Sequence, residues 1–529
     1  MIKPLHELVP LDALLRRRAE AEPDRPLVAT AEMSSTVNAR EYLDLVGAAA
    51  AALAERGVGP GDRIALWGQN SLAWSLWFCA AAWRGASIVA LHPALDPDDV
   101  SASLRQARVD WLIADEVSRG RKLGAMAHAL FDALSGDENG CLRGLTVVPG
   151  GDGMLDHSAV FDCSAAVPDP AGSLDTPLNI QFTSGSTGSP KAVVLSHRAL
   201  LTNALLTARA AAIDSGDRVV SPLPLYHAAG LSSGLLLSLV TGALWCTSHR
   251  FEPATSMALI ETCNATVFQG VPTMFRALID LAGRQDCVHP SLRLGFIGGA
   301  PCPSDLCAEA ISVLGLSRMA IVYGQTEFGP TIAMTRGDEP ASLALTSVGR
   351  PLPGVELQIV APETDDVLPP GSTGEIWVRG ATVMEGYYGD PEATAAAITP
   401  DGWLRTGDLG LVTQGCMRIR GRLKELIIRG GENISPIEIE EALRGLPGVA
   451  EVVVVPAPSA YWGEEICAVI EASGDQAVNI DALSQYCAER LPRLKQPDRY
   501  IFRDGLPLLP SGKIDRAAVR RAVARDEWA

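Results

Sequence analysis

The sequence lacks the features that would direct the protein to a nucleic acid or into a membrane. Lys and Arg number 44 against 62 Asp and Glu, so the net charge is −18. A mean field of this sign repels polyanions such as nucleic acid and anionic lipid. The most apolar stretch, residues 230–246, is interrupted by serine, threonine and glycine and falls short of the roughly 20 residues that a membrane helix needs. We therefore expect no nucleic-acid partner and no integral membrane segment, and we interpret 230–246 as a buried helix followed by a strand.

The cysteines do not form a pattern typical of zinc sites or disulfide frameworks. There are 11, with no C-x-x-C pair, and the nearest neighbours, Cys302 and Cys307, have no paired histidines. Reduced thiols in a cytosolic protein fit this usage. Residues 1–18 contain no apolar segment followed by a cleavage site, so we expect no signal peptide and a cytoplasmic location.

Two common nucleotide-binding motifs are also absent, because neither G-x-x-x-x-G-K-[ST] nor G-x-G-x-x-G occurs where a phosphate loop would require it. In their place stands a compact run of glycines and hydroxyls that ends in a cation, Thr183 to Lys191. Gly185 and Gly188 allow positive φ, so backbone N–H groups can turn inward around an anion. Apolar segments at 178–182 and 192–195 predict a strand on each side. A flexible linker is the alternative that composition alone favours, but a loop held between two strands favours phosphate binding.

The segment TSGSTGSPK resembles the signature loop of the adenylate-forming superfamily, which comprises acyl- and aryl-CoA synthetases, nonribosomal-peptide adenylation domains and firefly luciferase. Ala192 departs from the glycine more frequent there. Further similar blocks run from about Tyr42 to Arg516, nearly the whole chain. The resemblance implies that ATP phosphates bind to Lys191, which stabilises the leaving pyrophosphate, and to Thr183, Ser184, Gly185, Ser186, Thr187 and Gly188.

Length and pattern predict an α/β protein of more than one domain. A chain of 529 residues exceeds what one hydrophobic core usually supports. Helical periodicity at 41–55 and 71–83 alternates with strands at 63–67 and 88–91, which is typical of a parallel sheet. Short Gly- and Pro-rich strands follow at 347–421, and a small α+β segment ends the chain. We expect a large N-terminal domain of layered α/β sheets (1–422, with a small β-barrel-like subdomain at about 345–421), a hinge (423–425) and a small mobile C-terminal α+β domain (426–529).

A second block, Tyr323-Gly324-Gln325-Thr326-Glu327, follows an apolar run. An aromatic ring can stack on a purine, a threonine can donate to phosphate, and a carboxylate supplies the hard oxygen that Mg²⁺ prefers. A solvated surface carboxylate is the alternative for Glu327 alone. The resemblance implies catalytic roles for Thr326 and Glu327, nucleotide contacts from the whole block, Mg²⁺ at Glu327 and Thr183, and adenine beside Gly299, Ala300 and Pro301.

The remaining site residues rest chiefly on the resemblance. The sequence context of His227 fits a structural role as well as a site role, and the resemblance places it with Ala228 and Gly270 where the acyl pocket meets the thiol tunnel. In the C-terminal part it implies ribose binding by Asp408 and Arg422, a pivot at Lys424, passage of pantetheine at Gly430 and Gly431, and a catalytic Lys513 that bridges the substrate carboxylate and the α-phosphate.

These residues together predict an ATP-dependent carboxylic acid:CoA ligase with ATP, coenzyme A and Mg²⁺. The acid would become an acyl-adenylate and then a thioester, with release of pyrophosphate and AMP. An acyl-AMP ligase that loads the phosphopantetheine of an acyl carrier protein, and a non-catalytic acyl or nucleotide sensor, remain alternatives. An amino-acid-activating enzyme is disfavoured because no aspartate occurs at 225–230 to hold an α-amine, and luciferase-type oxygenation rests on fold analogy alone. The acid and the oligomeric state stay open.

Overall fold

The computed structural model describes residues 8–32, 36–135, 141–151, 154–155, 166–183, 190–285, 290–472, 479–508 and 514–528. The chain divides into two compact units. Unit 1 comprises Met1–Glu356 and Val378–Leu404, and unit 2 comprises Leu357–Trp377 and Arg405–Ala529. The β-rich segment predicted at about 345–421 is divided between them: residues 345–356 and 378–404 group with unit 1, and residues 357–377 and 405–421 group with unit 2. The boundary at 422/423 stays a prediction.

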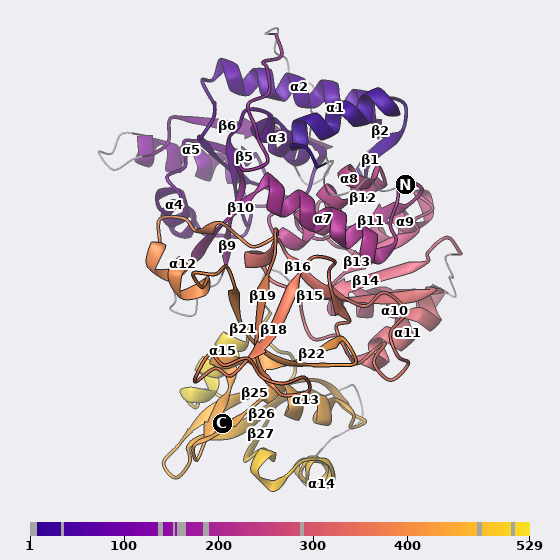
Figure 1. The fold of residues 1–529 in the computed structure, drawn as a ribbon, viewed down its shortest axis with the longest axis vertical. Helices are drawn as coiled ribbons and strands as arrows, with labels where there is room; N and C mark the ends of the chain where they lie inside the picture. The colour runs from indigo at the N-terminus through magenta and orange to yellow at the C-terminus, as the bar shows by residue number, and fades with distance from the viewer. Residues whose placement is uncertain are drawn as a thin grey trace. The chain divides into compact units, whose positions relative to one another are not determined.

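The larger sheet of unit 1 has nine strands in the order β17-β16-β15-β14-β13-β11-β12-β1-β2 (Figure 1). From β1 to β15 the neighbours run parallel, and β2, β16 and β17 join antiparallel at the edges. The carboxyl ends of β11, β13, β14 and β15 therefore meet at one edge of the sheet. The strands are β1 (Pro26–Thr30), β2 (Val37–Asn38), β11 (Arg218–Val220), β12 (Leu244–Thr247), β13 (Val267–Gly270), β14 (Leu294–Gly298), β15 (Arg318–Gly324), β16 (Thr331–Met334) and β17 (Arg350–Pro351).

The second sheet of unit 1 has the order β20-β10-β9-β4-β3-β5-β6. β9 and β10 pair antiparallel with Thr183 opposite Lys191, so the expected phosphate loop connects two strands, as the sequence predicts. Residues 184–189 of that loop lie outside the described residues. The strands are β3 (Arg63–Trp67), β4 (Ser87–Leu91), β5 (Trp111–Asp115), β6 (Gly144–Val148), β9 (Pro177–Thr183), β10 (Lys191–Ser196) and β20 (Gly386–Tyr387), and β7 (Gly150–Gly151) pairs with β8 (Met154–Leu155).

The helices of unit 1 begin where the local sequence supplies caps. Ser71 and Ser196 accept hydrogen bonds from the backbone N–H groups of Trp74 and Ala199, as N-caps do. The helices are α1 (Leu11–Ala21), α2 (Ala39–Glu55), α3 (Leu72–Trp83), α4 (Pro97–Gln106), α5 (Leu123–Ser135), α7 (His197–Ala211), α8 (Leu237–Thr241), α9 (Pro253–Thr262), α10 (Pro272–Gln285), α11 (Ser304–Leu314) and α12 (Pro391–Ala397), with a π-helix η2 (Ala229–Leu236) and a 3₁₀ turn η3 (Thr326–Phe328).

Two expectations from the sequence differ from the structure. The segment 135–175 is rich in Gly, Asp and Pro, a composition that predicts a loose surface connection, but it contains the strand β6, whose polar threonine and flanking glycine hide its strand character. The buried helix expected after Gly230 begins as a π-helix of eight residues, a form that sequence periodicity does not reveal.

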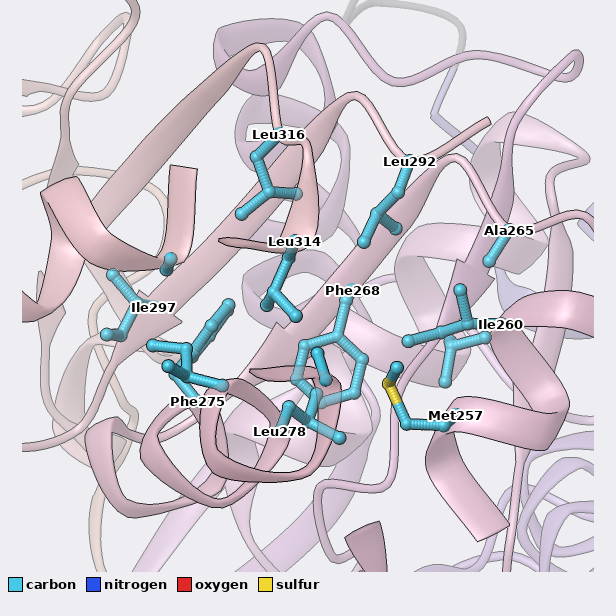
Figure 2. Close-up of a cluster of buried hydrophobic side chains, with 14 of the residues drawn as sticks. Met257, Ile260, Ala265, Phe268, Phe275, Leu278, Leu292, Ile297, Leu314 and Leu316 are labelled. Atoms are coloured by element: carbon cyan, nitrogen blue, oxygen red, sulfur yellow. The ribbon is translucent and has the colours of Figure 1, made fainter. Parts of the chain in front are cut away.

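A hydrophobic cluster packs beneath the larger sheet and fixes its strands (Figure 2). Phe268 of β13 and Phe275 of α10 meet edge to face with ring centroids 5.2 Å apart, and both are fully buried. Leu314 and Leu316, from the end of α11 and the turn after it, pack against the same cluster. Burial of such side chains contributes roughly 1.5–3 kcal/mol each, so the carboxyl ends of β13 and β14 rest on a rigid base.

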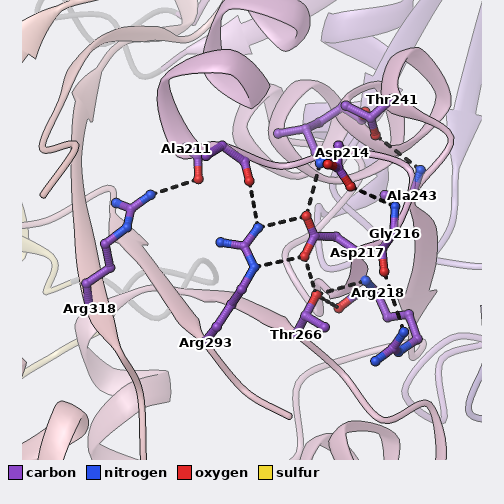
Figure 3. A network of polar contacts seen from close by, with 12 residues as sticks. Ala211, Asp214, Gly216, Asp217, Arg218, Thr241, Ala243, Thr266, Arg293 and Arg318 are labelled. Carbon is purple, nitrogen blue, oxygen red and sulfur yellow. Dashed lines mark hydrogen bonds and ion pairs between the residues drawn. The ribbon is translucent and has the colours of Figure 1, made fainter. Parts of the chain in front are cut away.

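At the amino ends of the strands in this sheet, a polar network joins neighbouring segments, as Figure 3 shows. Asp217 precedes β11, Thr266 precedes β13 and Arg293 precedes β14. The Asp217 carboxylate accepts from Arg293 (3.0 and 2.7 Å) and from Thr266 Oγ1 (2.6 Å). Burial opposes ionisation of Asp217, but these hydrogen bonds outweigh it and hold its pKa below the usual value. The amino ends of three strands are thereby locked, and the carboxyl ends carry the site.

Unit 2 contains most of a four-stranded sheet and all of a five-stranded one. Glu440 is fully buried and accepts from Arg516 (2.5 Å) and from the Val454 N–H (2.8 Å), which joins α13 to the second sheet and to α15. The elements are β18 (Glu356–Val360), β19 (Gly374–Arg379), β21 (Leu404–Thr413), β22 (Cys416–Arg422), η4 (Leu423–Glu425), β23 (Ile427–Arg429), β24 (Glu432–Ile434), α13 (Pro436–Arg444), β25 (Val449–Ser459), β26 (Gly463–Ala472), α14 (Ile480–Arg490), η5 (Arg493–Lys495), β27 (Arg499–Arg503) and α15 (Arg516–Ala524).

Candidate active site

The carboxyl edge of the nine-stranded sheet gathers the unit 1 residues that the sequence assigns to adenine, metal and acid. β14 and β15 are parallel neighbours with Gly298 opposite Val322. The turn that follows β14 and the block that follows β15 therefore leave the sheet side by side. β13 ends at Gly270, opposite Ile297 of β14. Open α/β sheets bind ligands at this edge. The residues gathered there are His227, Ala228, Gly270, Gly299, Ala300, Pro301, Tyr323, Gly324, Gln325, Thr326 and Glu327.

A cation, a phenol and a carboxylate meet at the centre of this region. The Lys191 Nζ lies 4.6 Å from the ring centroid of Tyr387, over its face. The Tyr387 hydroxyl donates to Glu327 Oε1 at 3.1 Å. Burial raises the pKa of Tyr387, and the adjacent Glu327 carboxylate raises it further, so the phenol stays protonated and remains a donor. One tyrosine therefore holds the phosphate-loop lysine and the expected metal ligand together.

Backbone pairing explains why these three residues meet. β20 pairs antiparallel with β10, and Tyr387 lies opposite Val193, two residues after Lys191. Residues two apart on a strand share a face, so the lysine and the tyrosine lie on the same side. The Met384 N–H donates to the Glu327 carbonyl at 2.9 Å, which joins η3 to the same segment.

The Glu327 turn is itself fixed by close backbone approach. Gly324 ends β15, and a Cβ at this position would collide with the Pro330 carbonyl. The Gln325 N–H donates to that carbonyl at 2.9 Å, and Gly329 (φ +75°) ends the 3₁₀ turn. Only glycine permits this approach at 324, which is a physical reason for its place between Tyr323 and Gln325.

The residues present fit Mg²⁺ bound partly through substrate. Among the described residues, no three His, Cys, Asp or Glu side chains lie close enough to form a metal site by themselves. Glu327 is half-buried and offers a carboxylate whose position Tyr387 fixes. Thr183 lies at the end of β9, and its Oγ1 donates to the Lys191 carbonyl at 3.5 Å. Mg²⁺ typically takes one or two carboxylates and completes its shell with phosphate oxygens and water, and this donor set suits that mode.

The segment after β11 forms the expected acid side. Pro222 and Pro224 lack an N–H, and the chain turns so that the His227 N–H donates to the Pro224 carbonyl at 3.1 Å. The ring of His227 lies 5.0 Å from that of Tyr226 and 6.2 Å from that of His92. Ala228 is buried and η2 begins at the next residue.

A buried apolar cluster adjoins this segment. Leu223, Val271 and Met274 pack together with Phe251 beside them. Gly270 precedes Val271, and a Cβ at 270 would touch Met274 and Phe268. Apolar side chains therefore pack directly after the end of β13.

In unit 2 the structure brings together the two residues expected at the ribose. Asp408 of β21 lies opposite Arg422 of β22, and Arg422 Nε donates to Asp408 Oδ1 at 2.8 Å. The Asp408 side chain is 4% exposed and the Arg422 side chain 48% exposed. The guanidinium therefore orients a buried carboxylate while the Arg422 side chain itself stays accessible to solvent. Lys424 lies in η4, the short turn that joins β22 to β23.

The glycine pair of unit 2 forms a sharp turn beside an indole. Gly430 (φ +60°) and Gly431 (φ +88°) both occupy the left-handed region. A Cβ at 430 would meet the Trp462 ring at 2.9 Å, whereas a Cβ at 431 would meet nothing within 4 Å. The Gly430 N–H donates to the Trp462 carbonyl at 2.9 Å. Position 431 is thus open to a thin ligand, and position 430 is closed by the indole.

The sequence motifs predict most of these residues but not Tyr387 and Trp462. Tyr387 follows a glycine in a Gly-Tyr-Tyr-Gly run, a signal of a turn but not of its partner. The expected phosphate-loop residues Ser184, Gly185, Ser186, Thr187 and Gly188, and the expected catalytic Lys513, lie outside the described residues. Their roles remain predictions.

Comparison with known proteins identifies the family. The model of AMP-binding enzymes matches residues 15–388, and the model of the AMP-binding enzyme C-terminal domain matches residues 438–513. The chain therefore belongs to the AMP-binding enzyme family, which confirms the predicted adenylate-forming resemblance.

Individual relatives match over nearly the full length. YngI of Bacillus subtilis (strain 168) is 35% identical over 525 residues, 96% of each chain. The mitochondrial medium-chain acyl-CoA ligase ACSF2 of Mus musculus is 31% identical over 528 residues, 96% of this chain and 86% of that one. The o-succinylbenzoate CoA synthetase MenE from Bacillus subtilis, solved with the acyl-adenylate intermediate OSB-AMP, superposes with a TM-score of 0.82 at 27% identity over 96% of this chain and 97% of that one. The predicted fold class is confirmed.

Proposed function

We propose that this chain is an ATP-dependent carboxylic acid:CoA ligase that forms an acyl-adenylate and then a thioester. The observation that carries the proposal is the contact of one tyrosine with both the phosphate-loop lysine and the Glu327 carboxylate. Relatives named as acyl-CoA ligase and CoA synthetase support the activity class.

In the first half-reaction a carboxylate oxygen of the acid attacks the α-phosphorus of ATP, and the bond from that phosphorus to the pyrophosphate oxygen breaks. Two anions must approach each other, so catalysis consists mainly of positioning and charge neutralisation. Lys191 neutralises the leaving pyrophosphate, and Tyr387 fixes the lysine and the carboxylate. Mg²⁺, held by Glu327 and Thr183, would neutralise phosphate oxygens when bound. Lys513 bridges the acid and the α-phosphate.

In the second half-reaction the thiol of coenzyme A loses its proton and attacks the acyl carbonyl, and AMP leaves. Asp408 accepts hydrogen bonds from the ribose hydroxyls, and Arg422 keeps that carboxylate oriented. The pantetheine arm passes the backbone at Gly431, where no side chain stands in the way.

An apolar monocarboxylic acid of medium chain length is the substrate class that we infer. Leu223, Val271 and Met274 form a buried apolar cluster beside Gly270, and the name of one relative specifies medium-chain acids. A panel of hexanoate, octanoate, decanoate, palmitate, benzoate and o-succinylbenzoate, assayed for AMP release, tests this. Highest kcat/KM for octanoate or decanoate supports the inference, and preference for a dicarboxylate contradicts it.

Carboxylate-dependent ATP–pyrophosphate exchange tests the function itself. Octanoate should stimulate exchange, and coenzyme A should accept the acyl group from the enzyme. A protein that binds ATP without exchange with any acid of the panel would be the sensor, and transfer to a holo-carrier protein but not to coenzyme A would identify the acyl-AMP ligase.

The cytoplasmic location stays a proposal. Across the described ranges, no helix is long and apolar enough to cross a membrane.

A further inference from the structure

Two buried asparagines that are not among the expected site residues bind the backbone of two segments that carry site residues. Asn203 on α7 is completely buried, and Asn70, in the turn after β3, is 2% exposed. Both use side-chain amide groups to hold backbone that other parts of unit 1 contribute. We propose that Asn203 is a positioning residue for the Thr326–Glu327 turn and that Asn70 is a positioning residue for the segment that leads to His227. The inference rests on the proposed function.

Asn203 binds the far side of the Glu327 turn through both groups of its amide. Its Nδ2 donates to the carbonyls of Phe328 (3.1 Å) and Thr331 (2.8 Å), and its Oδ1 accepts from the Thr331 N–H (3.1 Å). The Oδ1 also accepts from Ser232 Oγ of the π-helix at 3.4 Å. α7 contacts β16, which begins at Thr331, and the two lie side by side in Figure 1.

The place of Asn203 in the chain gives these bonds a consequence. α7 follows β10 directly, and β10 begins at Lys191. Asn203 therefore ties the element that continues from the phosphate loop to the turn that carries Glu327. Tyr387 joins the same two parts at the site, and Asn203 joins them behind it. A buried amide with all its groups paired is rigid, and loss of its donors removes one hydrogen bond from each of two backbone carbonyls, those of Phe328 and Thr331.

Asn70 does the same for the acid side. Its Nδ2 donates to the Leu223 carbonyl (2.9 Å) and to Thr247 Oγ1 (3.2 Å), and its Oδ1 accepts from the Leu225 N–H (2.8 Å). The segment 221–227 cannot pair as a strand because prolines 222 and 224 lack an N–H. The asparagine supplies the bonds that a neighbouring strand would otherwise make.

Isosteric aspartates separate the two roles, because aspartate keeps the acceptor oxygen and loses the NH₂ donors. For Asn203→Asp at pH 8 we expect carboxylate-dependent exchange to fall by about tenfold or more, and the Mg²⁺ concentration for half-maximal exchange to rise several-fold. As the pH falls, a buried carboxyl takes up a proton and donates one hydrogen bond again, so the rate relative to wild type should partly recover. For Asn70→Asp we expect a higher KM for the acid and a changed ranking of acids, with the Mg²⁺ requirement unchanged.

Thr266→Val is the matched control, since it removes a partly buried hydrogen bond at the amino ends of the strands in the same sheet. It should lower thermal stability without a change in Mg²⁺ requirement or acid ranking. If Asn203→Asp and Asn70→Asp alter the two requirements in the same ratio, or if Thr266→Val reproduces either effect, the inference is wrong.

Hydrogen exchange of the backbone amides provides a readout that does not depend on activity. Its first result comes from the wild-type protein, so it does not require that a variant folds. In the wild-type protein the amides of Phe328, Gly329 and Thr331 should exchange as slowly as those in the middle of α7, and in Asn203→Asp they should exchange faster while α7 stays protected. Turn amides that exchange orders of magnitude faster than α7 in the wild type would overturn the inference. If the wild type shows no acid-dependent ATP–pyrophosphate exchange, both the proposed function and this inference are overturned. If Asn203→Asp shows normal ATP–pyrophosphate exchange with an unchanged Mg²⁺ requirement, only this inference is overturned.

Discussion

Tyr387 performs two separable tasks, because its ring lies under Lys191 and its hydroxyl donates to Glu327. Tyr387→Phe keeps the ring and removes the donor. Because a hydrogen bond to a charged group is worth roughly 1.5–3 kcal/mol, we expect about a tenfold higher Mg²⁺ requirement in pyrophosphate exchange. Tyr387→Leu also removes the ring face, worth roughly 0.5–1 kcal/mol to the ammonium, and should lower the exchange rate a further two- to fivefold.

Tyr388→Phe is the matched control, since the neighbouring ring lies near Arg63 instead. An unchanged Mg²⁺ titration in Tyr387→Phe, or an equal shift in Tyr388→Phe, would contradict the role given to the hydroxyl.

His197 gives the stability of unit 1 a pH dependence. The ring is completely buried at the start of α7, its Nδ1 accepts from the Leu11 N–H at 3.3 Å, and burial lowers its pKa from 6.5 to about 4. The unfolded chain takes up a proton below pH 6.5 and the folded protein does not, so the free energy of unfolding falls as the pH decreases from 6.5 to 4, by about 2 kcal/mol at pH 5.

Urea unfolding at pH 7.5 and 5.0 checks this prediction. The loss of stability between the two pH values should be smaller by about 2 kcal/mol in His197→Gln than in the wild type. His128 lies exposed on α5, so His128→Gln should leave the difference unchanged. A wild-type difference in His197→Gln would show that the buried ring does not cause the slope.

At the scale of elements, the amino ends of the strands in the nine-stranded sheet contribute stability, and their carboxyl ends carry the residues proposed for the chemistry. Asp217→Asn keeps the shape of the side chain and removes the negative charge that pairs with Arg293. We expect a loss of about 1–3 kcal/mol in stability, because a charge-assisted pair is broken beside a partly buried guanidinium. Thermal unfolding should detect it, while the Mg²⁺ requirement of pyrophosphate exchange stays at the wild-type value. Wild-type stability, or a shifted Mg²⁺ requirement, would refute this division of the sheet.

The sequence predicts elements whose signals are local and misses contacts that are not. Strand 63–67 appears as expected, and Ser71 and Ser196 cap the helices that they precede, since periodicity and capping act over a few residues. The contact of Tyr387 with Lys191 depends on the pairing of β20 with β10, which are far apart in the chain. No single segment encodes such a pairing. The π-helix at 229–236 likewise has no signal in the sequence periodicity.

At the scale of the molecule, the two units divide the proposed reaction. Lys191, Tyr387 and Glu327 belong to unit 1, and Asp408, Gly431 and Lys513 belong to unit 2. The proposal assigns Lys513 to adenylation and Gly431 to thioester formation, so the part of unit 2 that follows Lys424 would have to present different residues in successive steps. A rotation at Lys424, within the turn η4, would accomplish this, since hinge residues absorb changes of φ and ψ at the ends of elements.

Glycines of equal conformation provide a controlled test of this division. Gly431 and Gly415 both have positive φ (+88° and +75°) and open space at the Cβ, so a leucine strains each backbone alike. Gly415 lies in the β21–β22 turn, away from the expected thiol path. Gly431→Leu should therefore slow capture of the acyl group by coenzyme A, and Gly415→Leu should not.

The most direct measurement is single-turnover kinetics of each half-reaction for Lys513→Ala, Gly431→Leu and Gly415→Leu, with octanoyl-adenylate supplied for the second step. We predict that Lys513→Ala abolishes most adenylation, by at least about a hundredfold, while coenzyme A still captures the supplied adenylate at a rate near that of the wild type, a loss that corresponds to about 3 kcal/mol of transition-state stabilisation. Gly431→Leu should show the reverse pattern. If Lys513→Ala and Gly431→Leu slow both half-reactions in the same ratio, the two-step division of the reaction is contradicted.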